Sequence, residues 1–150
     1  MKTILITGSS RGIGKATALL AAKQGYKVIV HGREDSRELE LTHKEVNGSV
    51  KTFFDISDKE AATKAIADLG HIDVLVNNAG MGFSGIQDIS EVSDDDALWE
   101  YRVNVMGTLH CIQAVLPNMV KHGSGSVVNV ASLKGHYHLT TLSSLTYGAS

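Results

Sequence analysis

The stretch ILITGSSRGIGKA, residues 4–16, joins a short apolar run to three closely spaced glycines. The β-branched run 3–7 predicts a strand buried on both faces. Apolar residues recur at helical spacing from Gly12 to Gln24, which predicts a helix directly after the glycines. This stretch therefore predicts a strand, a tight turn and a helix.

The same alternation continues along the chain. Further short apolar runs predict strands at 27–31, 50–55, 73–77 and 126–132. Helical patterns lie between them, at 36–46, 58–69 and 94–122, and a last one opens near Ser143. Because strands alternate with helices, we expect right-handed crossovers and a parallel sheet between two layers of helices. The predicted fold class is a doubly wound α/β domain with three layers.

Residues with preferred positions at helix ends support these boundaries. Gly25, Gly70 and Gly123 each follow a helical pattern, where glycine commonly ends a helix. Ser57 or Asp58 is expected to cap the helix that follows. We expect the long pattern 94–122 to break near Gly107.

Composition narrows the classes of function. A chain of 150 residues is the size of one domain, and a net charge of -2 without any basic run argues against a nucleic-acid or anionic-membrane surface. Cys111 is the only cysteine, so an intrachain disulfide is excluded; we expect this thiol to fill the core. No apolar run reaches the length of a membrane span. These features predict a cytoplasmic protein with a small-molecule ligand.

The glycine loop suggests what the ligand is. Gly8, Gly12 and Gly14 have the spacing G-x3-G-x-G, which lets the backbone approach a pyrophosphate at the start of a helix. The same glycines also occur in strand-to-helix turns that only serve the fold, and this alternative stays open.

The end of the second predicted strand indicates which dinucleotide is bound. An acidic residue there binds the ribose of NAD, whereas a basic residue accommodates the extra phosphate of NADP. Gly32 stands in that place, Arg33 follows it and Arg11 lies in the glycine loop, so NADP(H) is favoured and NAD(H) remains possible. The alternative is that Arg33 forms a surface ion pair with Glu34 or Asp35.

Asp55 closes the third predicted strand. It is placed to bind an adenine edge, or else it caps the following helix.

Five motifs occur together in one order: TGSSRGIG at 7–14, NNAG at 77–80, VNVMG at 103–107, Ser132 and YGAS at 147–150. In this combination the chain resembles the short-chain dehydrogenase/reductase family in its single-domain form. The resemblance covers the whole chain. It implies a Rossmann-type fold, a nicotinamide cofactor, and the interconversion of a small-molecule carbonyl and alcohol by a homo-oligomeric protein.

The resemblance also implies site residues. The catalytic set would comprise Asn104, Ser132 and Tyr147, with a lysine four residues after the tyrosine, just beyond Ser150. Tyr147 would donate and accept the proton, Ser132 would polarise the substrate oxygen, and Asn104 would hold a water. The expected cofactor-binding residues are Gly8, Ser10, Arg11, Gly12, Ile13, Gly14, Arg33, Asp55, Ile56, Asn78, Ala79 and Gly80.

Other interpretations of the catalytic residues remain open. Ser132 could cap a strand, and Asn104 could be an ordinary polar residue of a helix. Tyr147 could be an ordinary aromatic residue, with Tyr137 as a rival. Tyr147 follows Ser132 by 15 residues, a longer separation than we expect for the family, and a small insertion within 134–145 would explain it.

His136 and His138 alternate in that segment. Without a third ligand of matching spacing, we interpret them as surface or substrate-loop residues, and no metal site is predicted.

The missing lysine leads to two expectations. The first is that residues 1–150 are the N-terminal part of a longer family domain, so that the fold is incomplete at its C-terminal end. The second is an alternative function, a nucleotide-binding sensor or inactive module that binds cofactor without turnover.

Overall fold

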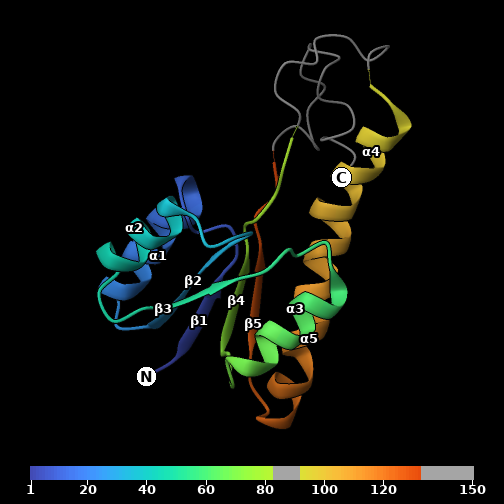
Figure 1. The fold of residues 1–150 in the computed structure, drawn as a ribbon. Helices are drawn as coiled ribbons and strands as arrows, with labels where there is room; N and C mark the ends of the chain where they lie inside the picture. Colours follow the sequence, from blue (N-terminus) through green and yellow to red (C-terminus); the bar gives the residue numbers. More distant parts are fainter. Residues whose placement is uncertain (83–91, 133–150) are drawn as a thin grey trace.

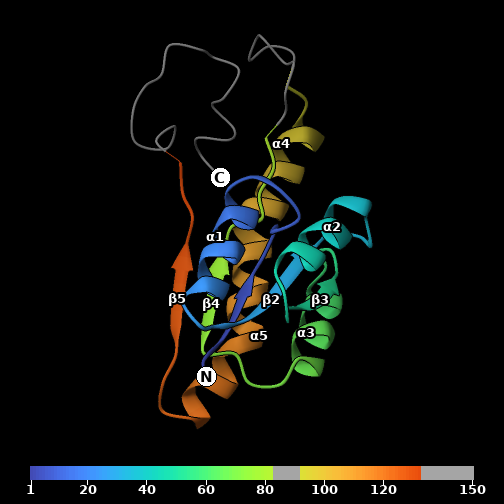
Figure 2. The ribbon, with the colours of Figure 1, turned by 90° about the vertical axis from the view of Figure 1, so that its left-hand side faces the viewer.

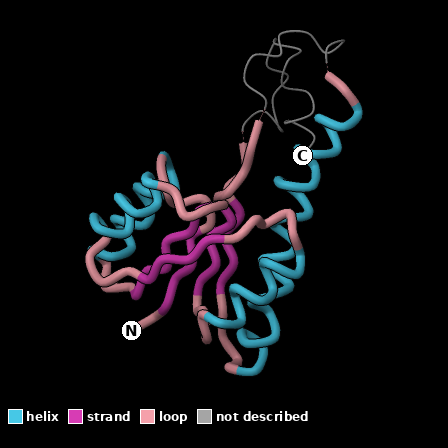
Figure 3. Tube along the Cα trace, in the orientation of Figure 1, coloured by secondary structure: helices cyan, strands magenta, loops and turns pink. Residues whose placement is uncertain are grey.

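The computed structural model describes residues 1–82 and 92–132, which form a parallel sheet with helices on both faces (Figures 1 and 3). The strands stand in the order β3-β2-β1-β4-β5, and every neighbouring pair is parallel. Their bounds are β1 (Thr3–Ile6), β2 (Lys27–Gly32), β3 (Val50–Phe53), β4 (Val74–Asn77) and β5 (Ser126–Asn129).

The helices divide between the two faces of the sheet (Figures 1 and 2). One face carries α1 (Gly12–Lys23) and α2 (Arg37–Glu45), and the other carries α3 (Lys59–Asp68) and α5 (Thr108–Lys121). Helix α4 (Asp94–Tyr101) leads into α5 and lies beyond the carboxyl ends of the strands. This arrangement is the doubly wound, three-layer α/β fold that the sequence predicts.

The central strand β1 shows why both faces need cover. Side chains of a strand point alternately to its two faces. Leu5 belongs to the apolar cluster beneath α3 and α5, whereas Ile4 and Ile6 belong to the cluster beneath α1. All three are almost completely buried, so the continuous apolar run 4–6 indicates a strand between two helix layers.

The predicted helix ends are confirmed. Gly25, Gly70 and Gly123 all have positive φ just after a helix, where glycine adopts that conformation without strain. Asp58 caps α3, because its carboxylate accepts hydrogen bonds from the backbone N–H groups of Glu60 and Ala61.

The α-helix is interrupted next to Gly107 as predicted, although the backbone there stays helical. A wider π-helical segment, η2 (Arg102–Gly107), joins α4 to α5. A Cβ atom on Gly107 would lie 2.6 Å from the Cγ1 atom of Ile56. The glycine is therefore required by close packing of this turn against the loop after β3.

Two further sequence expectations bear on the described elements. Cys111 lies in the core as predicted, and its burial raises the pKa of the thiol to about 12. Among residues 1–82 and 92–132, the helices are too short or too polar to cross a bilayer.

The Gly107 contact can be tested by a double-mutant cycle. Gly107→Ala should lower the free energy of unfolding by about 1–3 kcal/mol, because the new methyl group overlaps Ile56. Ile56→Ala should cost about 2–5 kcal/mol on its own. The double variant should lose clearly less than the sum, as measured by urea denaturation; strictly additive losses would contradict the packing argument.

Candidate functional site

A cavity of about 430 Å³ opens at the carboxyl ends of β1, β2, β3 and β4. In open parallel sheets, ligands bind outside this edge, where neighbouring strands send their connections to opposite faces. Here β1 leads to α1 on one face, while β4 leads toward α4 on the other. The cavity thus lies where a doubly wound fold is expected to bind its ligand.

The glycine loop between β1 and α1 packs tightly against the segment after β4. A Cβ atom on Gly8 would lie 2.7 Å from the Cα atom of Ala79. A Cβ atom on Gly14 would lie 2.5 Å from both the Gly8 carbonyl oxygen and the Asn78 side-chain nitrogen. Any side chain at these two positions would displace backbone, so both glycines are required by close approach.

Hydrogen bonds fix the same contact. The Asn78 side-chain amide donates to the carbonyl oxygens of Thr7 and Gly8, at 2.9 and 3.1 Å. The Thr7 hydroxyl accepts from the backbone N–H groups of Asn78 and Ala79, both at 3.0 Å. These bonds join the loop after β4 to the glycine loop and give it a defined position.

His31, at the end of β2, supports the loop from the other side. Its Nδ1 atom accepts a hydrogen bond from the Gly8 N–H, and its Nε2 atom lies 3.0 Å from the Phe54 carbonyl oxygen. The ring must therefore be neutral, with the proton on Nε2. Burial lowers the pKa of His31 to about 4, which keeps the imidazole in this form at neutral pH.

The N-terminus of α1 is open toward the cavity. Helices α2, α3 and α4 each begin with a serine or aspartate side chain that accepts backbone N–H groups, but the N-cap of α1 is Arg11, without a side-chain cap bond. Ser10, Arg11 and Ile13 line the cavity. Free N–H groups, the helix dipole and a guanidinium together suit an anion.

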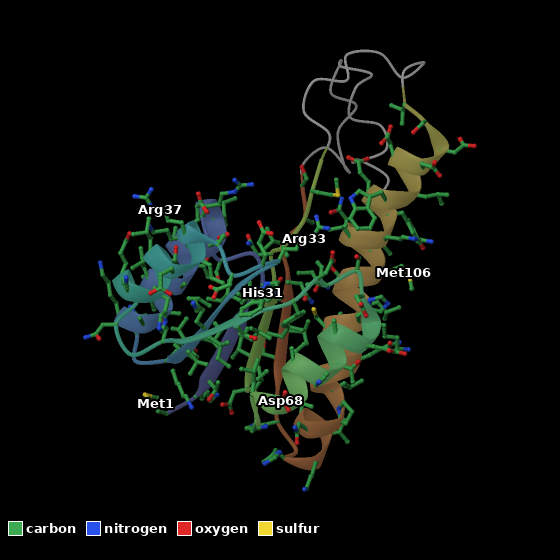
Figure 4. The ribbon with its side chains drawn as sticks, in the orientation of Figure 1. Met1, His31, Arg33, Arg37, Asp68 and Met106 are labelled. Atoms are coloured by element: carbon green, nitrogen blue, oxygen red, sulfur yellow. The ribbon has the colours of Figure 1, made fainter. Side chains whose placement is uncertain are left out.

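Arg33 also lines the cavity and lies just past β2 (Figure 4). Its Nε atom donates to the Asp55 carboxylate at 3.0 Å, and its guanidinium carbon lies 5.6 Å from the centre of the Trp99 ring. The expected alternative partners do not hold it; Asp35 instead pairs with Lys51 at 2.7 Å. A Cβ atom on Gly32 would make tight contacts, at 3.1 Å from Leu39 Cδ2 and from the Glu34 carbonyl oxygen.

Asp55, just after β3, holds Arg33 through an ion pair. One carboxylate oxygen accepts from the backbone N–H and the hydroxyl of Ser57, and the other pairs with Arg33. Burial alone would raise the pKa of the carboxyl, but the bonds from Ser57 and the charge of Arg33 outweigh it and hold the pKa below its usual value. Asp55 is thus a charged group beside the cavity, and Asp58 performs the capping instead.

The three expected catalytic residues are placed unequally. Asn104 lies in η2, a kind of segment frequent at functional sites, and its amide exchanges two hydrogen bonds with the backbone of Met81, at 2.8 and 2.9 Å. Ser132 is half-buried and follows the carboxyl end of β5. Tyr147 and its rival Tyr137 lie outside the described residues.

Most of the expected cofactor-binding residues meet at the cavity. Those that line it are Gly8, Ser10, Arg11, Ile13, Arg33, Asp55, Ile56, Asn78, Ala79 and Gly80. Gly12 and Gly14 belong to the same loop without lining the cavity. In the described part of the chain, no three potential ligands gather to hold a metal ion; His136 and His138 lie outside it.

Several cavity residues are not predicted from the sequence, among them His31, Phe54, Trp99 and Val103. His31 carries one signal that could have been used, since it is a polar residue at the end of an otherwise apolar strand. Trp99 carries none, because its direction depends on how α4 is rotated.

Comparison with known proteins agrees with this geometry. The family model for short chain dehydrogenases matches residues 2–150. The chain belongs to the short-chain dehydrogenase family. The family resemblance of the five motifs and the predicted fold class are both confirmed.

Individual relatives extend this result. An uncharacterized oxidoreductase of Staphylococcus saprophyticus is 37% identical over an alignment of 157 positions, gaps included. The alignment covers 99% of this chain and 65% of that protein. The crystal structure of a 3-oxoacyl-acyl carrier protein reductase from Brucella melitensis with bound NAD superposes with a TM-score of 0.90 at 30% identity, covering 99% of this chain and 59% of that one. The protein ElxO, solved with NADP bound, gives 0.88 at 31% identity, covering 99% and 61%. This short-chain dehydrogenase chain thus spans less than two thirds of the length of these proteins.

The neutral state of His31 predicts a pH dependence of stability. The pKa is about 4 in the folded chain and about 6.5 when exposed, so the unfolded state takes up a proton first as the pH falls. Protonation of His31 has almost no effect on the free energy of unfolding above about pH 7. At about pH 5 it should lower that free energy by about 2 kcal/mol.

Urea denaturation of wild type and His31→Gln at about pH 7.5 and about pH 5 measures this effect. Glutamine offers an acceptor and a donor but does not titrate. The variant should lose about 2 kcal/mol less than wild type between the two pH values, whatever its stability at the higher pH. Equal losses would show that His31 does not titrate as the hydrogen bonds require.

Proposed function

We propose that this chain is the dinucleotide-binding part, residues 1–150, of an NADP(H)-dependent oxidoreductase that interconverts a carbonyl and an alcohol on a small molecule. The main support is the cavity beside the glycine loop, which both Arg11 and Arg33 line. Its family membership and the cofactors named for its structural relatives support the same reading.

The residues present fit a nicotinamide dinucleotide. An uncapped helix start beside Arg11 suits a pyrophosphate, and Gly12 leaves open space, since a Cβ atom there would meet nothing within 4 Å. After β2, Gly32 stands where a carboxylate that binds the NAD ribose would be expected, while Arg33 supplies a cation for the 2′-phosphate of NADP. Relatives with NAD and with NADP are both known, so the preference for NADP(H) rests on these side chains.

Asn78, Ala79 and Gly80 contribute in two ways. Asn78 holds the glycine loop through its side chain, and all three line the cavity on the β4 side. We assign the Asn78 amide to positioning the pyrophosphate loop, and Ala79 and Gly80 to direct contact with the nucleotide.

The cofactor, when bound, supplies or accepts a hydride, and the protein must move one proton to or from the substrate oxygen. We assign that proton to the Tyr147 hydroxyl, with Ser132 donating a hydrogen bond to the substrate oxygen. A free phenol has a pKa of about 10, so Tyr147 requires a nearby cation, which the lysine expected after Ser150 would supply. Asn104 anchors the loop that carries Met81 to η2, and a water held there is part of the proposal.

Other properties of the full-length protein stay predictions. Homo-oligomerisation and a cytoplasmic location follow from the family resemblance and from the composition. Nucleic acid is not an expected partner, since the net charge is -2.

Binding distinguishes the proposed function from a purely structural role of the glycine loop. Isothermal titration calorimetry with NADPH and with NADH should give a tighter complex with NADPH. If neither nucleotide binds, the proposal fails. If NADPH binds but no carbonyl in a broad panel oxidises it, the chain is a nucleotide-binding module without turnover.

Arg33→Ala should weaken NADPH binding by about tenfold to a hundredfold, because a charge-assisted hydrogen bond to phosphate is lost. NADH affinity should change by less than about threefold, because NADH lacks the 2′-phosphate. Arg37→Ala is the matched control, since Arg37 is also exposed and basic but does not line the cavity. Equal losses for both nucleotides in Arg33→Ala would refute the NADP(H) assignment.

Tyr147→Phe should lower the rate of NADPH oxidation by a carbonyl substrate at least about a hundredfold, as expected for loss of a general acid. Calorimetry should show NADPH affinity within about twofold of wild type, because the ring is retained. The test uses the full-length protein. Unchanged turnover in Tyr147→Phe would move the proton-donor role to another residue, with Tyr137→Phe as the next variant.

A further inference from the structure

Three side chains from different parts of the sequence meet at the cavity. Arg33 follows β2, Asp55 follows β3, and Trp99 comes from α4, more than forty residues further along the chain. All three line the cavity. The proposed function assigns roles to Arg33 and Asp55 but leaves Trp99 without one.

The contacts among the three form a chain. The Asp55 carboxylate holds the Arg33 Nε atom at 3.0 Å, and the Arg33 guanidinium carbon lies 5.6 Å from the centre of the Trp99 ring. Because Asp55 is itself fixed by two hydrogen bonds from Ser57, the guanidinium is directed from the sheet toward α4. The β2 side and the α4 side of the cavity therefore meet through one arginine–indole contact.

This contact contributes little to the stability of the fold. The Arg33 side chain is 71% exposed, and an ion pair or a cation–π contact at such a site is weak because water screens it. A ligand can therefore replace the contact at small cost. Trp99 is only half-buried, so its ring surface is available on the cavity side.

The chemistry of these surfaces selects a flat aromatic ligand with an anionic group. An indole ring and a guanidinium plane both stack on nucleobases, and a guanidinium also pairs with phosphate. The Asp55 carboxylate, on the other side of the guanidinium from the indole, can accept a hydrogen bond from an amino group. An adenosine phosphate has all three features, whereas a simple anion would not use the indole.

We propose that Trp99 is a cofactor-binding residue that closes the adenosine end of the cavity opposite Arg33, with Asp55 positioning the guanidinium. The proposal rests on the proposed function, because it takes the ligand to be an adenine dinucleotide. Trp99 supplies stacking surface, Arg33 supplies charge, and both act on the adenosine half alone. The nicotinamide half is independent of Trp99.

Binding of each half of the cofactor can be measured separately with fragments. Adenosine 2′,5′-bisphosphate carries the adenine, the ribose and the extra phosphate, and nicotinamide mononucleotide carries the other half. Trp99→Ala should weaken the bisphosphate about tenfold, the usual effect of removing a stacked aromatic side chain. Trp99→Phe should retain most of the affinity. Binding of nicotinamide mononucleotide should stay within about twofold of wild type in both variants.

Tyr101→Ala is the matched control, because Tyr101 is also an aromatic residue of α4, is 46% exposed and does not line the cavity. It should bind the bisphosphate as wild type does. A double-mutant cycle with Arg33→Ala and Trp99→Ala should be non-additive, because the two side chains contact each other beside the bound ligand.

Fluorescence gives a second readout. Trp99 is the only tryptophan among these 150 residues, so the indole emission of this chain reports on that one ring. The bisphosphate should change the emission and saturate at the affinity that calorimetry gives, while nicotinamide mononucleotide should leave it unchanged.

The outcomes distinguish this proposal from the proposed function. If wild type binds NADPH but Trp99→Ala binds the bisphosphate as tightly as wild type does, the role of Trp99 is refuted and the proposed function stands. Equal weakening of both fragments in Trp99→Ala would show that Trp99 only supports α4, which also overturns the proposal. If wild type binds neither NADPH nor the bisphosphate, the proposed function itself fails.

Discussion

The site depends on one close approach between the glycine loop and the segment after β4. Gly8 and Gly14 leave no space for a side chain, so the backbone of residues 8–14 lies directly against Asn78 and Ala79. Such packing brings the N-terminus of α1 to the edge of the sheet and leaves its first N–H groups facing the cavity. A larger residue at either glycine would separate the two connections that line the cavity.

The polar atoms behind the loop are satisfied by partners that the fold brings together. The Asn78 amide donates to the Thr7 and Gly8 carbonyl oxygens. The Thr7 hydroxyl accepts from two backbone N–H groups, and neutral His31 accepts from the Gly8 N–H. Buried groups without such partners would each cost about 1–3 kcal/mol. The inner side of the loop is thus bonded to protein, and only its outer side remains for a ligand.

The sequence predicts the fold well because the hydrophobic period and the glycines agree along the chain, as at Ile4 to Ile6 and at Gly25 and Gly70. It does not predict the partner of Arg33. Glu34 and Asp35 are the neighbours in sequence, but parallel pairing of β2 with β3 brings Asp55 beside it instead. The direction of Trp99 depends on how α4 is rotated about its axis. The π-helical turn η2 depends on a local change in the backbone hydrogen-bond pattern. Hydrophobic periodicity predicts neither.

The contacts around the glycine loop and those around Arg33 differ in rigidity, and this difference bears on affinity and specificity. Around Gly8 and Gly14, backbone packing and buried hydrogen bonds define the geometry before a ligand arrives, so little ordering cost accompanies binding there. Around Arg33, exposed and screened contacts can rearrange, and the cost of ordering this long side chain is partly offset because Asp55 already restrains it. The rigid region around the glycine loop suits a group common to all dinucleotides, the pyrophosphate. The adjustable region around Arg33 suits the group by which they differ, so exposed side chains can set the cofactor preference without disturbing the packed glycine loop.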